Sequence, residues 1–388
     1  MNIILFDTQT RGRLFPLTLT RAVADVRIGI LTMKERWEKI TGAKIFVSTD
    51  SYLQPLYETI PPDNYVFIDA SIIPSHEVIE KIINLSDTEN ISDGNGLIAG
   101  KASIDFLPSV EELPGLFKNV TLIPAVKRLR FPNEIFLLNE EMIRFDFKLL
   151  TKGRISDDHN DSVHVTKPSQ IFIEDGAEIS YSNLNASSGP IYIGKSATIM
   201  EGCFIRGPFA LCEGAVLKMG TKIYGATTIG PFCIAGGEIK NSVMSGYTNK
   251  AHGGYLGDSV IGEWCNLGAG TTNSNVKNTA GEIKMWNYYE NNFVPSGNKC
   301  GVIMGDYSRT AINTSINTGT VIGLCCNVFG KGLTSKVIDN FSWGTEGQNR
   351  YEFEKVIKDI TNWKKMKNKT INEPETNVLK HIFETYNK

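Results

Sequence analysis

One histidine in a glycine-rich stretch is the clearest candidate for chemistry in this chain of 388 residues. Residues 247–271 read YTNKAHGGYLGDSVIGEWCNLGAGT. His252 is followed directly by Gly253 and Gly254, which have no side chains to crowd a molecule that approaches the imidazole. Imidazole titrates near neutral pH and is well suited to act as a general base. A lone histidine can also be purely structural, so the residues by themselves leave both roles open.

A strict six-residue repeat must position this histidine. Two positions before each repeated aliphatic residue the side chain is mostly small, and three positions after it come residues that suit a tight corner. This period cannot be an α-helix, and it predicts a triangular solenoid whose inward aliphatic side chains stack into one core. His252 lies between the register positions 249 and 255, so we expect it outside that core. The predicted inward positions are Ile173, Ile179, Ile193, Ile199, Ile205, Leu211, Leu217, Ile223, Ile229, Val243, Tyr255, Ile261, Leu267, Ile316, Ile322 and Val328.

The first 150 residues have a different pattern, in which short apolar runs alternate with helical spacing. This alternation predicts an α/β, Rossmann-like domain with a mainly parallel sheet. The predicted strands are 2–6, 43–49 and 64–70, and the predicted helices are 32–41, 75–85 and 130–150. The expected organisation is an α/β domain at 1–150, a linker at 151–169, a parallel β-helix at 170–345 and a tail at 346–388. The tail reads as two amphipathic helices that cover the end of the solenoid.

Composition excludes several classes of partner. The formal net charge is −2, which offers no electrostatic basis for binding nucleic acid or an anionic membrane. No apolar run approaches the roughly 20 residues of a membrane helix, and the N-terminus lacks the features of a signal peptide. The seven cysteines show no CxxC pairing and are expected to be buried reduced thiols. We therefore expect a cytoplasmic protein.

The repeat and the histidine motif together resemble a known family. The hexapeptide array is similar to the left-handed β-helix acyltransferases. The run from His252 to Thr271 closely resembles the acetyltransferase half of the bifunctional N-acetylglucosamine-1-phosphate uridyltransferase / glucosamine-1-phosphate N-acetyltransferase family. That family reads His-x-x-Tyr-Leu-Gly-Asp, Ile-Gly, Asn-x-Gly-Ala-Gly-Thr and a further Asn. The matching residues here are His252, Tyr255 to Asp258, Ile261 and Gly262, Asn266 to Thr271, and Asn275.

This resemblance implies roles for individual residues. His252 would take a proton from the amine of a sugar phosphate as that amine attacks acetyl-CoA. Tyr255 and Asn266 would hold the amino sugar, while the Ala269 backbone and Asn275 would lie near the thioester. Lys299 and Lys240 match family lysines that bind the sugar and its phosphate, although either one could be an ordinary surface charge. The resemblance also implies a homotrimer with the acyl-CoA site between neighbours. A carbonic-anhydrase interpretation of the same fold requires three interface histidines, and the predicted solenoid has one.

The N-terminal domain resembles the sugar nucleotidyltransferases less closely. Their phosphate loop reads Leu-Ala-Ala-Gly-x-Gly-Thr-Arg, and the glycine pair is missing here. Arg11, Arg13 and Arg21 are expected to bind the triphosphate by charge instead, unless they pair with acidic side chains at the surface. Asp69 ends a predicted strand as the family's Mg²⁺-binding aspartate does. The short domain suggests an alternative branch of the bifunctional family.

The family resemblance implies two reactions. The β-helix would acetylate glucosamine-1-phosphate from acetyl-CoA, and the N-terminal domain would transfer UMP from UTP to the product with Mg²⁺. Two alternatives stay open. One is the same fold acting on a different sugar phosphate or acyl donor. The other is a trimeric scaffold that binds a sugar nucleotide without turnover.

Overall fold

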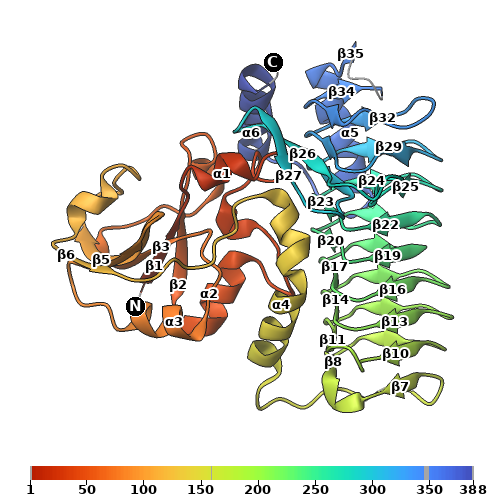
Figure 1. The fold of residues 1–388 in the computed structure, drawn as a ribbon, viewed down its shortest axis with the longest axis horizontal. Helices are drawn as coiled ribbons and strands as arrows, with labels where there is room; N and C mark the ends of the chain where they lie inside the picture. The colour runs from red at the N-terminus through yellow and green to blue at the C-terminus, as the bar shows by residue number, and fades with distance from the viewer. Residues whose placement is uncertain (1, 159, 345–348, 387–388) are drawn as a thin grey trace.

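A mixed six-stranded sheet forms the centre of the N-terminal domain. The computed structural model describes residues 2–158, 160–344 and 349–386. Figure 1 shows the two domains side by side, with the β-helix parallel to α4. The strand order is β2-β1-β3-β5-β4-β6. The bounds are β1 Asn2–Phe6, β2 Lys44–Ser48, β3 Asp63–Asp69, β4 Glu89–Asp93, β5 Gly96–Ile104 and β6 Asn119–Leu122.

The predicted strands are confirmed, but the sheet is less parallel than expected. β1 runs parallel to both β2 and β3, whereas β5 is antiparallel to both β3 and β4. The cause is local, because Asp93 pairs with Gly96 across the turn DGNG. So short a connection can join only antiparallel strands, and Asp-Gly is a strong hairpin signal.

The helices of this domain lie where the pattern predicted them. Thr32 and Glu35 form a reciprocal capping box at the start of α2, and the Ser75 side chain accepts a hydrogen bond from Val78 N at the start of α3. The bounds are α1 Thr10–Arg13, α2 Met33–Thr41, α3 His76–Ile83 and α4 Pro132–Thr151, with short 3₁₀ turns at Val23–Asp25, Gln54–Leu56 and Leu113–Leu116.

The second domain is a parallel β-helix of the left-handed type, made of three stacked sheets. A 3₁₀ turn, Pro168–Gln170, joins its first two strands. The far sheet, on the side away from the N-terminal domain, contains β7 His164–Thr166, β10 Asn183–Asn185, β13 Phe204–Arg206, β16 Lys222–Tyr224, β19 Glu238–Lys240 and β22 Tyr255–Gly257. The facing sheet, next to α4, contains β8 Ile171–Ile173, β11 Ile191–Ile193, β14 Phe209–Leu211, β17 Thr227–Ile229, β20 Val243–Met244, β23 Val260–Ile261, β28 Val302–Met304, β31 Thr320–Ile322 and β33 Val337–Ile338.

The third sheet closes the triangle. Its strands are β9 Glu178–Ile179, β12 Thr198–Ile199, β15 Val216–Leu217, β18 Ile234–Ala235, β21 Asn249–Lys250, β24 Asn266–Leu267, β29 Arg309–Thr310, β32 Asn327–Val328, β34 Ser342–Trp343 and β35 Asn349–Arg350. Two further pairs are β25 Thr272–Asn273 with β30 Ser315–Ile316, and the hairpin β26 Lys284–Asn287 with β27 Asn292–Pro295. The first strand, β7, starts inside the segment predicted as a linker.

Two predicted inward positions are wrong by one residue. Ile229 aligns with Met244, and Met244 aligns with Ile261, so Met244 takes the inward position predicted for Val243. Ile239 likewise aligns with Leu256, which leaves Tyr255 pointing outward. The physical reason is a shortened coil between Ile229 and Met244, after which an unbroken period of six no longer holds.

The facing sheet is buried on both sides, which explains why Val243 is apolar without pointing inward. Val243, Val260 and Ile303 join the core of the N-terminal domain together with residues of α4 such as Phe136. Further along, Phe147 of α4 and Tyr192 of β11 belong to another shared cluster. The two domains therefore share a continuous apolar interface.

The tail forms two helices, as predicted. They are α5 Phe353–Lys365 and α6 Glu373–Thr385, and Asn372 caps the second. Their apolar faces contact the β-helix through Trp264 and Tyr307, and the N-terminal domain through Leu19 and Leu53. The tail thus packs against both domains, and not only on the solenoid. The predicted boundary at 345/346 lies outside the described residues. Among the described helices, none combines the length and apolarity needed to span a membrane.

Candidate functional sites

A cleft of about 1180 Å³ opens at the carboxyl ends of β1 and β3. Its lining includes the loop from Asp7 to Arg13, Asp69 and Arg128. In open sheets with parallel strands, ligands bind outside the carboxyl ends of the strands. The structure therefore brings Arg11, Arg13 and Asp69, all predicted from the sequence, to one place.

The two arginines in this cleft differ in their freedom to meet a ligand. The Arg11 guanidinium is buried and donates to Thr18 O at 2.7 Å and to Tyr52 Oη at 3.0 Å, with Asp50 as a further partner. It therefore fixes the loop after β1. Arg13 has a side chain that is 38% exposed, and among the described residues its one ion pair joins Nε to Glu290 at 2.9 Å. Arg13 is therefore the more accessible arginine of the pair.

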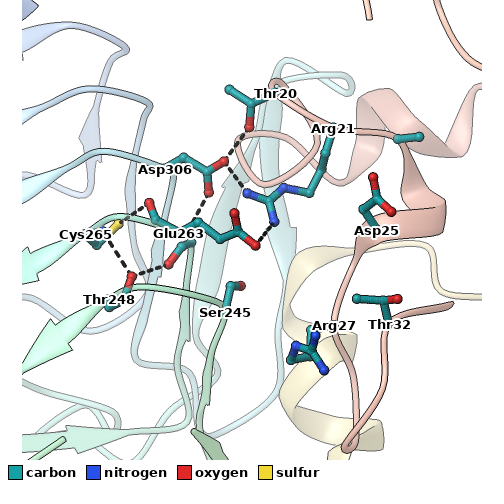
Figure 2. A network of polar contacts seen from close by, with 12 residues as sticks. Thr20, Arg21, Asp25, Arg27, Thr32, Ser245, Thr248, Glu263, Cys265 and Asp306 are labelled. Carbon is teal, nitrogen blue, oxygen red and sulfur yellow. Dashed lines mark hydrogen bonds and ion pairs between the residues drawn. The ribbon is translucent and has the colours of Figure 1, made fainter. Parts of the chain in front are cut away.

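Arg21 lies elsewhere, in a second cleft of about 590 Å³ between the two domains and the tail. Its guanidinium contacts Glu263 Oε1 at 2.9 Å and also bonds to Asp306, both on the β-helix. Figure 2 shows this network, in which Thr20 also reaches Asp306. Arg21 thus joins the domains and does not line the cleft of Arg11 and Arg13.

Asp7 is an ionisable group at the end of β1 in the first cleft. Its carboxylate is buried, and it accepts hydrogen bonds from Val23 N at 2.9 Å and Thr49 Oγ1 at 2.6 Å. Burial raises its pKa to about 7, although these hydrogen bonds and Arg11 oppose the shift. The folded protein therefore binds a proton here that the unfolded chain releases at much lower pH.

We expect Asp7→Asn to remove a pH dependence of stability. The wild-type pKa is about 7 when folded and near 3.8 when unfolded, so wild-type stability should fall as pH rises between these values and then level off. At pH 8 the variant should be more stable by roughly 2–4 kcal/mol. Urea unfolding at several pH values checks this. At a pH close to 4 the wild type and the variant should have similar free energies of unfolding. If the stability of the variant depended on pH as steeply as that of the wild type, Asp7 would not be the titrating group.

The surroundings of Asp69 do not fit a resident Mg²⁺ ion. Asp69 Oδ1 accepts from Ser71 N at 2.9 Å and Ser71 Oγ at 2.8 Å, while Oδ2 faces Arg128 Nε at 3.3 Å. Arg128 also donates to Asp93 Oδ2 at 2.5 Å, so a guanidinium occupies the place of a cation. Within the described parts of the chain, no three His, Cys, Asp or Glu side chains are grouped to hold a metal. Burial raises the pKa of Asp69, which also disfavours a free carboxylate.

The second candidate site surrounds His252, at the corner between β21 and β22. The His252 side chain is exposed. Three residues further along the chain, Tyr255 Oη accepts from Asn275 Nδ2 at 3.1 Å, and Asn275 Nδ2 also donates to Asp258 Oδ2 at 2.5 Å. Burial and then the nearby Asp258 raise the Tyr255 pKa to about 12, so the phenol is neutral at physiological pH. Tyr255 and Asn275, predicted separately, thus belong to one hydrogen-bonded group.

The other predicted residues of this site lie on several neighbouring elements and differ in exposure. Lys240 is exposed on β19, directly beside β22, and Lys299 is exposed before β28. Ala269 lies in the turn after β24, where its carbonyl accepts from Asn313 N at 2.7 Å. Asn266 belongs to the third sheet, paired with Asn249 and Arg309. Among the described contacts, none joins Asn266 to His252.

A buried lysine that sequence reasoning missed supports the loop of His252. Lys250 is 2% exposed and aligns with Ala235, whose side chain points inward. Its Nζ donates to the carbonyls of Gly236 at 3.1 Å, His252 at 3.2 Å and Gly254 at 2.8 Å. Burial lowers the Lys250 pKa to about 8. A lysine at an inward position is the signal that could have found it, but the shortened coil hid that position.

A domain with known relatives precedes the parallel β-helix in this chain. Residues 3–155 match the family described as "Sugar nucleotidyl transferase". The chain is also a distant homologue of bifunctional enzymes. It is 34% identical over 103 residues to the "Bifunctional protein GlmU" of Methanocaldococcus jannaschii, which covers 26% of this chain and 25% of that protein.

Two further relatives give the same result. The chain is 35% identical over 92 residues to the "Bifunctional sugar-1-phosphate nucleotidylyltransferase/acetyltransferase" of Sulfurisphaera tokodaii, covering 24% of this chain and 23% of the relative. It is 29% identical over 161 residues to the GlmU protein of Thermus thermophilus, covering 35% of each. The matches span about a quarter to a third of the relatives' length.

Proposed function

We propose that this protein acetylates an amino sugar-1-phosphate on its β-helix and transfers a nucleotidyl group to a sugar-1-phosphate in its N-terminal cleft. The specific substrates we propose are glucosamine-1-phosphate with acetyl-CoA, and UTP with N-acetylglucosamine-1-phosphate. The single observation that carries the proposal is the exposed His252 at the corner that precedes Tyr255, whose hydroxyl is hydrogen-bonded to Asn275, in a chain that has a sugar nucleotidyl transferase domain.

In the acetyl transfer, His252 acts as the general base. The amine of the sugar attacks the thioester carbon while the imidazole takes up the proton, because an ammonium nitrogen has no lone pair with which to attack. The new C–N bond forms, the C–S bond breaks, and the thiolate of CoA takes the proton from the imidazolium and leaves as the thiol. The Ala269 backbone N–H stabilises the oxyanion and Asn275 lies near the thioester, while Tyr255, Asn266 and the lysines Lys240 and Lys299 hold the sugar phosphate.

A homotrimer completes this site in our proposal. Asn266 faces outward from the third sheet, whereas Tyr255 and Asn275 belong to the side of the far sheet. One chain therefore does not bring all the proposed residues to one surface, and neighbouring subunits packed around the β-helix supply the missing ones, with acetyl-CoA between them. Sedimentation of the purified protein tests the trimer directly.

In the nucleotidyl transfer, a phosphate oxygen of the sugar-1-phosphate attacks the α-phosphorus of UTP and pyrophosphate leaves. Arg13 and Arg128, both in the cleft lining, supply positive charge to the phosphates. Because Arg128 faces Asp69, we propose that Mg²⁺ enters only as part of the nucleotide substrate. The seven buried, unpaired cysteines support a reducing, cytoplasmic location.

Two assays on the wild-type chain test the proposal. Acetyl-CoA with glucosamine-1-phosphate should release free CoA, and UTP with N-acetylglucosamine-1-phosphate should release pyrophosphate. If the protein turned over only another amino sugar phosphate or another nucleotide, the reaction types would stand and the specific substrates that we propose would be wrong. Binding of a sugar nucleotide with no release of either product would establish the scaffold alternative instead.

Lys250→Met should slow acetyl transfer by about 10- to 100-fold. Methionine has a similar length and keeps the inward position filled, but it donates no hydrogen bond to the carbonyls of His252 and Gly254. A misplaced catalytic group costs rate steeply. The measurement is kcat for CoA release, which should fall more than the KM for the sugar changes. Unaltered kcat in a folded variant would show that the amine does not position His252.

A further inference from the structure

The hairpin β26–β27 extends from the β-helix to the N-terminal cleft. It follows Asn275 and ends shortly before Lys299, and Figure 1 shows it crossing toward α1. Its base is fixed, because Ile283 and Met285 are fully buried in the core that the two domains share. The tip, residues 287–290, is therefore held at the loop that follows β1.

The tip contacts this loop through several independent interactions. Asn287 Nδ2 donates to Arg13 O at 2.8 Å, and Glu290 pairs with Arg13 Nε at 2.9 Å. Tyr289 Oη lies 3.1 Å from Gln9 Oε1, and the Arg13 guanidinium lies 5.4 Å from the centre of the Tyr289 ring. A methyl group added to Gly12 would come within 2.7 Å of the Tyr289 ring, so the ring rests directly on the loop backbone.

Tyr289 nevertheless keeps surface free. Its side chain is 45% exposed and belongs to the lining of the N-terminal cleft, together with Arg13 and Arg128. The ring thus presents an aromatic face within the same cleft that holds the cationic side chains. Nucleobases stack on such faces whatever their sequence identity, because every base has a π-face.

We propose that Tyr289 stacks on the base of a nucleoside triphosphate bound in the N-terminal cleft, so that the β-helix domain contributes a binding residue to the nucleotidyl-transfer site. The hairpin tip at the same time orients Arg13 toward the phosphates. This inference rests on the proposed nucleotidyl transfer and names the residue that recognises the base.

The test compares Tyr289→Ala and Tyr289→Phe with a matched control, Tyr224→Ala. Tyr224 is 44% exposed on β16 of the far sheet, so its loss removes a similar surface elsewhere. Binding of UTP and of inorganic triphosphate is measured by calorimetry. We expect Tyr289→Ala to weaken UTP binding by about tenfold or more and to leave binding of inorganic triphosphate within about twofold. Tyr289→Phe and Tyr224→Ala should bind UTP as the wild type does.

Two results would overturn the inference. Wild-type affinity for UTP in Tyr289→Ala would show that the ring makes no contact with the base. An equal loss for UTP and for inorganic triphosphate would show that Tyr289 only supports the loop. If the wild type itself bound no UTP, the proposed function and this inference would fail together, which separates that case from the first two. CoA release by Tyr289→Ala confirms that the variant is folded.

Discussion

Replacement of His252 by alanine should lower CoA release by about 10²- to 10⁴-fold, the usual contribution of a general base. The imidazole is exposed at the corner between β21 and β22, so its removal leaves no cavity and should barely change stability. The measurement is kcat/KM for CoA release with glucosamine-1-phosphate between pH 5 and 9.

Two controls make this result specific. His164→Ala removes another exposed imidazole, on β7 of the far sheet, and should leave the rate unchanged. Pyrophosphate release by His252→Ala should also stay at the wild-type level, because His252 lies between β21 and β22 and is not among the residues that line the N-terminal cleft. A rate within threefold of the wild type would assign the base to another group.

The second large effect concerns stability. Asp146→Ala should lower the free energy of unfolding by about 3–5 kcal/mol, the usual cost of removing one partner of a buried ion pair. Asp146 and Arg36 are both fully buried, and Arg36 Nε donates to Asp146 Oδ1 at 2.7 Å. Asp146 Oδ2 also accepts from Ile30 N at 2.8 Å and Leu31 N at 3.1 Å, so the variant leaves a buried guanidinium without its carboxylate and two backbone N–H groups without this acceptor.

The same helix offers a matched control for this prediction. Glu141 on α4 pairs with Lys127 at 2.7 Å, and both side chains are about half exposed. Glu141→Ala should therefore cost less than about 1 kcal/mol. Urea unfolding of both variants measures the difference. If both variants lost the same free energy of unfolding, burial would not be what makes the Asp146–Arg36 ion pair important.

The extent of successful sequence prediction follows from the range of the interactions involved. The hexapeptide period is local and repeated, so the β-helix and inward positions such as Ile316 and Ile322 could be predicted. One shortened coil was enough to misplace Val243 and Tyr255, because a change in coil length leaves no mark in a pattern of single aliphatic residues. The antiparallel β4–β5 pair was missed although its Asp-Gly turn was visible.

The site residues also differ in how far the sequence could predict their positions. The motif gave Tyr255 and Asn275 separate roles, and only the fold shows that the stacking of consecutive coils joins them by a hydrogen bond. The arginines could not be sorted by sequence, since only the fold shows that Arg21 meets Asp306 on the other domain while Arg13 remains at the cleft. Lys250 was missed for a related reason, because its inward position depends on the coil length.

The hairpin that reaches the N-terminal cleft has a consequence for how this chain can be divided. A cut near residue 155 would separate the two domains in sequence, yet it would remove Tyr289 from the cleft lining and uncover Val243, Val260 and Ile303. The hairpin also lies in sequence between Asn275 and Lys299, two residues of the proposed acetyl-transfer site. The two halves are consequently not interchangeable modules, and neither is expected to be inherited or expressed as a working enzyme without the other.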